Sequence, residues 1–155
     1  MADPIPLDDL LEQERSLVFT RFDNETAIAL GLDILARGRA RGLPITVDVS
    51  RAGQQLFHAA LAGTAADNDR WVERKSAVVY RFGHSSLYVG ELCRQQGLSF
   101  EAKFLVDPRT YAAHGGAFPI TVKDVGLVGV VTVSGLPQRD DHALVVEALA
   151  EFLSR

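Results

Sequence analysis

The feature that most limits the fold is a hairpin at residues 45–61, "ITVDVSRAGQQLFHAAL". Apolar and polar residues alternate along 45–50, and Ala52-Gly53 forms a two-residue turn whose glycine tolerates a positive φ. Residues 120–133 repeat the arrangement, because an alternating segment, a turn at 124–126 and an apolar strand over 127–133 follow one another. Strands joined by tight turns pair antiparallel, so the two hairpins predict an antiparallel sheet.

Helix signals occupy most of the remaining chain. Asp23 is a good N-cap for a helix that stops before Gly42 and Pro44. The predicted elements are, in order, helix 7–16, strand 17–22, helix 24–41, hairpin 45–61, a helix from Asp67 or Asn68 to Gly83, a helix from Ser85 or Ser86 to about 96, hairpin 120–133 and a helix from Pro137. This order predicts an α+β fold, with helices packed on one antiparallel sheet. No repeat or low-complexity linker divides residues 1–155, so we expect one domain.

The helix at 24–41 is apolar almost all the way round over Ala27 to Leu32. A helix with one face in water does not need this pattern, so we expect it to be covered on two sides, by a second layer or by another subunit. Gly31 lowers helix stability relative to alanine, which predicts close approach of another backbone at that point.

Composition narrows the class of protein. Hydrophobic residues make up 47% and charged residues 23% of the chain, as in soluble globular proteins, and the net charge of −4 argues against a nucleic-acid partner. The start of the chain does not read as a secretory signal, and the most apolar stretch, 125–136, is too short to cross a membrane. Cys93 is the only cysteine, which excludes an internal disulfide and suits a small apolar filler. We therefore expect a cytoplasmic protein without a membrane partner.

The segment "YAAHGGAFPI", 111–120, carries the first candidate site residues. Gly115 and Gly116 either present backbone amides to an anion or only let the chain turn into the next strand. His114 is a candidate heme or metal ligand, or a proton carrier, because its ordinary pKa lies near neutrality. The four histidines are isolated in sequence and no zinc-binding spacing occurs. This absence argues against a zinc site more than against heme, because a single histidine can serve as an axial heme ligand.

Lys75 is the second candidate. It lies in a helical stripe with Trp71, Val78 and Phe82, a position that a lysine seldom occupies without a partner. The side chain either extends along the apolar face to water or meets a ligand carboxylate such as a heme propionate. In "RDDHA", 139–143, the two aspartates suit the first turn of a helix, where the helix dipole favours carboxylates, better than a metal cluster.

Three segments, "WVERKSAVVYRFGHSS", "HGGAFPI" and "GVVTVSGLPQRDDHALVVEAL", resemble the heme-degrading-domain family, which includes the heme-binding-protein-S type and the glycolate-operon G type. The match is best to a short single-domain branch of unknown function. The resemblance implies a profilin-like fold, a five-stranded antiparallel sheet flanked by helices, in a homo-oligomer. The marks that carry it are Gly115, Gly116, Phe118 and Pro119, the run Val133-Ser134-Gly135, and Lys75.

Together these features predict a small-molecule pocket, with heme as the candidate ligand, between the 111–119 loop and the helix bearing Lys75. The expected contacts are Phe118 and Trp71 as apolar walls, Lys75 as an anion partner, Gly115 and Gly116 as closely approaching backbone, and His114 as a polar contact. The alternative is a non-catalytic homo-oligomeric adaptor or assembly factor that binds other proteins, for which the apolar excess at 27–32 is the cue. An enzyme acting on a small organic acid is a third reading, by analogy alone.

Overall fold

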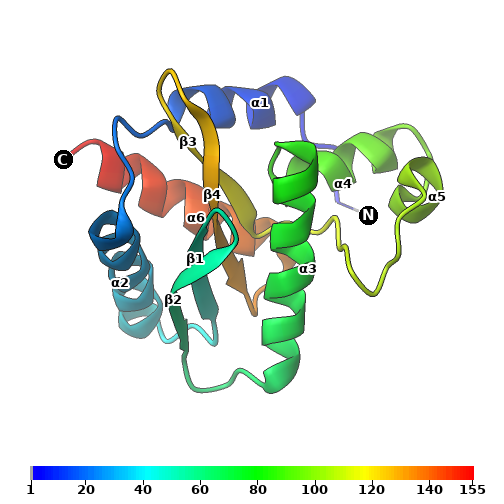
Figure 1. Ribbon diagram of the computed structural model, residues 1–155. Helices are drawn as coiled ribbons and strands as arrows, with labels where there is room; N and C mark the ends of the chain where they lie inside the picture. Colours follow the sequence, from blue (N-terminus) through cyan, green and yellow to red (C-terminus); the bar gives the residue numbers. More distant parts are fainter. Residues whose placement is uncertain (1) are drawn as a thin grey trace.

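The computed structural model describes residues 2–155 and contains one four-stranded sheet (Figure 1). The strands are β1 (Thr46–Arg51), β2 (Gln54–Ala60), β3 (Ala117–Val122) and β4 (Gly126–Ser134). Their order is β2-β1-β4-β3, and each neighbouring pair is antiparallel. The predicted α+β class with an antiparallel sheet is confirmed.

Six helices surround the sheet. They are α1 (Leu7–Ser16), α2 (Asn24–Arg41), α3 (Ala66–Phe82), α4 (Ser86–Gln95), α5 (Phe100–Phe104) and α6 (Gln138–Leu153). Helices α2 and α6 cover one face, α3 lies across the other, and α4 packs beside α3 (Figure 1). Across residues 2–155, no helix combines the length and the apolar character needed to cross a membrane.

Both hairpins form at the predicted turns. Ala52 and Gly53 have φ values of 50° and 82°, so both turn residues adopt the left-handed region that tight hairpins require. A bulge between Val49 and Ser50 shifts the register of the first hairpin by one residue. As a result, His58 pairs with Asp48. The predicted hairpins are confirmed, and the bulge is a feature that the residue pattern does not reveal.

The predicted strand at 17–22 is wrong, and the sheet has four strands where five were expected. Only Phe19 pairs, in an isolated parallel bridge to Val122 at the outer edge of β3. Its N–H donates to Thr121 O at 2.8 Å, and its carbonyl accepts from Lys123 N at 2.8 Å. Phe19 and Phe22 both point into the core, and a spacing of three residues does not suit the two-residue period of a strand. Burying both rings turns the chain away from the sheet edge.

The helix starts follow side-chain capping. Asp23 accepts from Thr26 N, as predicted, and Ser85 caps α4 by accepting from Tyr88 N. Helix α3 begins earlier than predicted, at Ala66. Asn68 is inside the helix, and its side-chain oxygen accepts from the backbone N–H of Ala65 at 2.9 Å. The α5 turn falls in a region that sequence patterns left without an assignment.

Helix α2 is covered by the sheet on one side and by α6 on another. The close contact at Gly31 is made by a side chain and not by a backbone, because a methyl group there would lie 2.2 Å from Cδ1 of Phe57. Leu32 remains 52% exposed, so the apolar character of this helix exceeds what the described chain buries.

The two faces of the sheet differ in polarity. The face toward α2 and α6 is an apolar core with almost no exposed area, formed by residues that include Val47, Val49, Phe118, Ile120, Val131 and Val133. The face under α3 also contains buried polar residues, namely Thr46, Asp48, Ser50, Thr132 and Ser134. The Thr46 and Thr132 hydroxyls have no hydrogen-bond partner within residues 2–155. A polar interior layer therefore lies between α3 and the sheet, and the candidate sites open at its two ends.

Candidate functional site

A cavity of about 420 Å³ lies where α3 meets the loop before β3 and the connection from β4 to α6. We call it the Lys75 cavity, and it is lined by Asn68, Trp71, Lys75, His114, Ser134, Gly135, Leu136, Gln138 and Asp141. Three residues predicted for the pocket, Trp71, Lys75 and His114, thus meet around one cavity.

The Lys75 amine does not reach water and has no need of a ligand carboxylate, because Asp141 of the same chain supplies a carboxylate. Its Nζ lies 2.9 Å from Asp141 Oδ2 and donates to the carbonyl of Val133 at 3.0 Å. The two charged side chains are only 4% and 2% exposed. Burial lowers the pKa of Lys75 against the opposing effect of Asp141, and burial likewise raises the pKa of Asp141. Asp141 lies in the first turn of α6, as predicted, and its Oδ1 also accepts from Leu136 N at 2.9 Å.

The two glycines are required by close packing. A Cβ at Gly115 would lie 2.3 Å from the carbonyl oxygen of Gln138. A Cβ at Gly116, where φ is +137°, would lie 2.3 Å from Val133 O and 2.6 Å from Lys75 Nζ. The Gly115 N–H already donates to Gln138 Oε1 at 2.9 Å, so it is not free for an anion. Gly116 brings backbone against the lysine and Gly115 brings it against Gln138 at the start of α6, consistent with the turn interpretation.

His114 projects from the loop at the mouth of the cavity. Its ring packs edge-on against Trp71, with centroids 5.4 Å apart, and the Arg74 guanidinium lies 4.6 Å from the Trp71 ring centre. Partial desolvation of the ring lowers the pKa of His114, and the nearby charges of Arg94, Lys75 and Arg74 lower it further. The imidazole is therefore neutral at neutral pH and keeps a free nitrogen lone pair.

Phe118 is not part of the cavity. Its side chain is fully buried on the opposite, apolar face of the sheet, where its ring lies 5.9 Å from that of His142. The alternation along β3 accounts for this placement, since Phe118 and Ala117 must point to opposite faces. Of the six predicted site residues, three line the cavity, Gly116 lies directly behind Lys75, Gly115 packs against Gln138, and Phe118 lies in the core.

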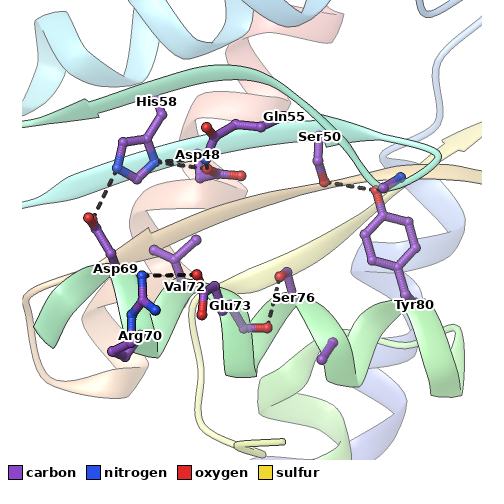
Figure 2. Close-up of a pocket in the computed structure, with 12 residues that line it drawn as sticks. Asp48, Ser50, Gln55, His58, Asp69, Arg70, Val72, Glu73, Ser76 and Tyr80 are labelled. Carbon is purple, nitrogen blue, oxygen red and sulfur yellow. Dashed lines mark hydrogen bonds and ion pairs between the residues drawn. The ribbon is translucent and has the colours of Figure 1, made fainter. Parts of the chain in front are cut away.

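A second cavity, of about 570 Å³, separates α3 from the β1–β2 hairpin (Figure 2). We call it the His58 groove. Asp48 Oδ2 lies 2.8 Å from His58 Nδ1, and Asp69 Oδ1 lies 3.0 Å from His58 Nε2. Burial alone would lower the pKa of His58, but hydrogen bonding to Asp48 and the two nearby carboxylates raise it. At the other end, Ser50 Oγ and Tyr80 Oη lie 2.8 Å apart.

Sequence reasoning missed the His58 groove and the partner of Lys75. The bulge in the hairpin places His58 opposite Asp48, whereas a regular two-residue hairpin would place His58 opposite Val47. Asp141 is 66 residues from Lys75, so no local spacing links them. Neither cavity forms a metal centre, since the part of the chain from residue 2 onward contains no group of three or more His, Cys, Asp or Glu suited to a metal.

Comparison with known proteins gives the chain a family. A family model described as "Haem degrading protein HbpS-like" matches residues 22–150. A UPF0303 protein of Streptomyces coelicolor is 57% identical over 145 residues, which cover 94% of this chain and 92% of that protein. The crystal structure of Ybr137w protein has a TM-score of 0.90 and 34% identity, covering 98% of this chain and 90% of that chain.

More distant structures share the fold. The crystal structure of a PduOC:heme complex has a TM-score of 0.66 at 16% identity, covering 86% of this chain and 94% of that chain. The resemblance first visible in the segments around Lys75, His114 and Asp141 is thus confirmed over nearly the whole chain. The chain belongs to the HbpS-like family of haem-degrading proteins.

Proposed function

We propose that this chain is a small-molecule-binding protein whose Lys75 cavity takes heme. The observation that carries the proposal is His114, an exposed imidazole at the mouth of that cavity with no hydrogen-bond partner within residues 2–155. The family description and a shared fold with a protein crystallised as a heme complex point to the same ligand. A cavity of about 420 Å³ lies in the range of small-molecule sites.

The residues around His114 suit heme. A neutral imidazole is a common axial ligand of heme iron, and the Trp71 ring beside it offers an apolar surface. Arg74, which lies close enough to lower the pKa of His114 and donates to the Pro108 carbonyl and not to a carboxylate, offers positive charge for a propionate. Asp141 already neutralises Lys75, and Glu91 pairs with Arg94, so Arg74 is a better anion partner than either. When bound, heme supplies a redox-active iron.

A heme titration followed by visible absorbance tests the proposal. We expect a Soret shift with the unaltered chain and loss of that shift in His114→Ala. His84→Ala is the matched control, because His84 is also partly exposed but pairs with Glu14 away from the cavity. A Soret shift that is the same in both variants contradicts the assignment of His114. Decay of the Soret band after a reductant is added would assign degradation in addition to binding.

We further propose that the chain acts as a homo-oligomer with a profilin-like arrangement. In this arrangement the isolated bridge from Phe19 to Val122 occupies the position of a fifth strand that is shortened to one residue. Large apolar side chains that remain exposed support self-association, notably Leu105 at 90%, Val125 at 72% and Leu32 at 52%. Sedimentation velocity of the chain and of Val125→Glu tests this, and a monomer at all concentrations contradicts it.

A further inference from the structure

Lys75 differs from the other two lysines of the chain in its surroundings. Lys123 is exposed and Lys103 partly exposed, whereas Lys75 is 3% exposed and is one of the residues that line the cavity. Gly116 lies so close behind Nζ that a methyl group there would be 2.6 Å away. The amine is therefore fixed in place at the wall of a space that a small molecule can enter.

The Lys75–Asp141 ion pair becomes a neutral amine and a carboxylic acid when one proton passes from Nζ to Asp141 along their 2.9 Å hydrogen bond. An ammonium group has three N–H donors, while a neutral amine has two donors and a lone pair. The part of the chain described from residue 2 on supplies two acceptors to Nζ, the Val133 carbonyl and the Asp141 carboxyl group. Burial acts in the same direction, because it disfavours the charged form and lowers the lysine pKa. A buried amine without its extra proton is a nucleophile toward carbonyl carbon.

We propose that Lys75 forms an imine with a small carbonyl compound, preferentially a 2-oxo acid, that enters the Lys75 cavity. This inference shares its cavity with the proposed heme site but does not depend on heme. Trp71 supplies an apolar wall for a short carbon chain. The positive charge of Arg74 near His114 favours a ligand with a carboxylate over a neutral one.

The reaction balances with the groups present. The Nζ lone pair attacks the carbonyl carbon, a C–N bond forms, and one amine proton passes to the former carbonyl oxygen. Asp141, 2.9 Å from Nζ and with a pKa raised by burial, then protonates the hydroxyl group, which leaves as water. The neutral amine, carboxylic acid and carbonyl compound thus become an iminium, a carboxylate and one water, and no oxidant or reductant is consumed.

Borohydride trapping tests the proposal. The protein is incubated with pyruvate at pH 7, sodium borohydride reduces any imine to a stable secondary amine, and peptide mass spectrometry gives the modified fraction at each lysine. We expect the modified fraction at Lys75 to exceed that at Lys123 severalfold, because Lys123 is exposed, whereas Lys75 lies at a cavity that holds the carbonyl compound beside its amine. Lys75→Arg should lose this product and Lys123→Arg should keep it.

Protein unfolded in urea is the matched control, because there the three lysines should react to similar extents. The site distribution is measured in the unaltered chain, so a folding defect in Lys75→Arg does not obscure the result. Equal modification of folded Lys75 and Lys123, or modification of the surface lysines alone, overturns the proposal. Heme titration of His114→Ala is read separately, so either proposal can fail without the other.

Discussion

Removal of the Asp141 charge should strongly destabilise the fold. Asp141→Asn keeps a side-chain oxygen that can accept from Leu136 N but leaves Lys75 buried without its carboxylate. Since both side chains are at most 4% exposed, loss of one partner should cost about 3–5 kcal/mol of unfolding free energy. With a urea dependence of roughly 2 kcal/mol per molar, the unfolding midpoint should fall by about 2 M. Fluorescence of Trp71, the only tryptophan, reports the transition.

Two variants complete this experiment. Lys75→Met combined with Asp141→Asn removes both charges, keeps the acceptor for Leu136 N, and should recover most of the lost stability, because no buried charge is left unpaired. Glu12→Gln breaks an exposed pair, in which Arg15 and Glu12 are 60% and 65% exposed, and should change stability by no more than about 1 kcal/mol. A loss of less than about 1 kcal/mol in Asp141→Asn would refute the reasoning that the pair is buried and mutually dependent.

Three further outcomes are expected. Burial lowers the pKa of His142 from 6.5 to about 4, so on acidification the unfolded chain takes up the His142 proton before the folded chain does. The free energy of unfolding should therefore fall by about 3 kcal/mol as the pH drops from 6.5 to about 4. Urea titrations at several pH values measure this loss, which should be absent from His142→Met. Gly116→Ala should lower the free energy of unfolding by about 2–3 kcal/mol, measured by thermal unfolding, because the added Cβ meets Val133 O. Gly53→Ala, at a position with a positive φ but open space, should lower it by only about 1 kcal/mol. Equal losses in the two variants would contradict the packing argument. Asp48→Asn should lower the pKa of His58, read from NMR titration of its ring protons, and an unchanged value would show that the hydrogen bond contributes nothing.

Local patterns were enough to predict most of the fold. The turn residues Ala52-Gly53 and the caps Asp23 and Ser85 act over a few residues, so their effects are legible in the sequence. The segment at 17–22 has residues that suit a strand, but tertiary packing decides its path, because the rings of Phe19 and Phe22 are both drawn into the core. Strand propensity alone does not account for the competition between pairing along the sheet edge and burial of the two rings.

The candidate site was only partly predictable for a similar reason. Lys75 was noticeable because a lysine in an apolar helical stripe is unusual, and Trp71 lies one turn away on the same helix. Asp141 reaches the lysine from another helix. Its position in the first turn of that helix was already explained by the helix dipole, which favours carboxylates there, so the sequence did not call for a further partner. The His58 groove depends on a one-residue register shift, which changes the face on which every later residue of β2 lies.

The difference in polarity between the two sheet faces affects which substitutions such a protein can accept during evolution. The apolar face holds the hydrophobic core, whose residues include Phe118 and Val131, and most substitutions there reduce stability. The face beneath α3 holds hydroxyls and carboxyl groups beside two cavities, so α3 can exchange groove-facing residues such as Ser76 or Glu73 without repacking that core. In the His58 groove, ligand choice can thus change while the apolar core stays intact. New binding preferences can arise on this scaffold through changes in a single helix.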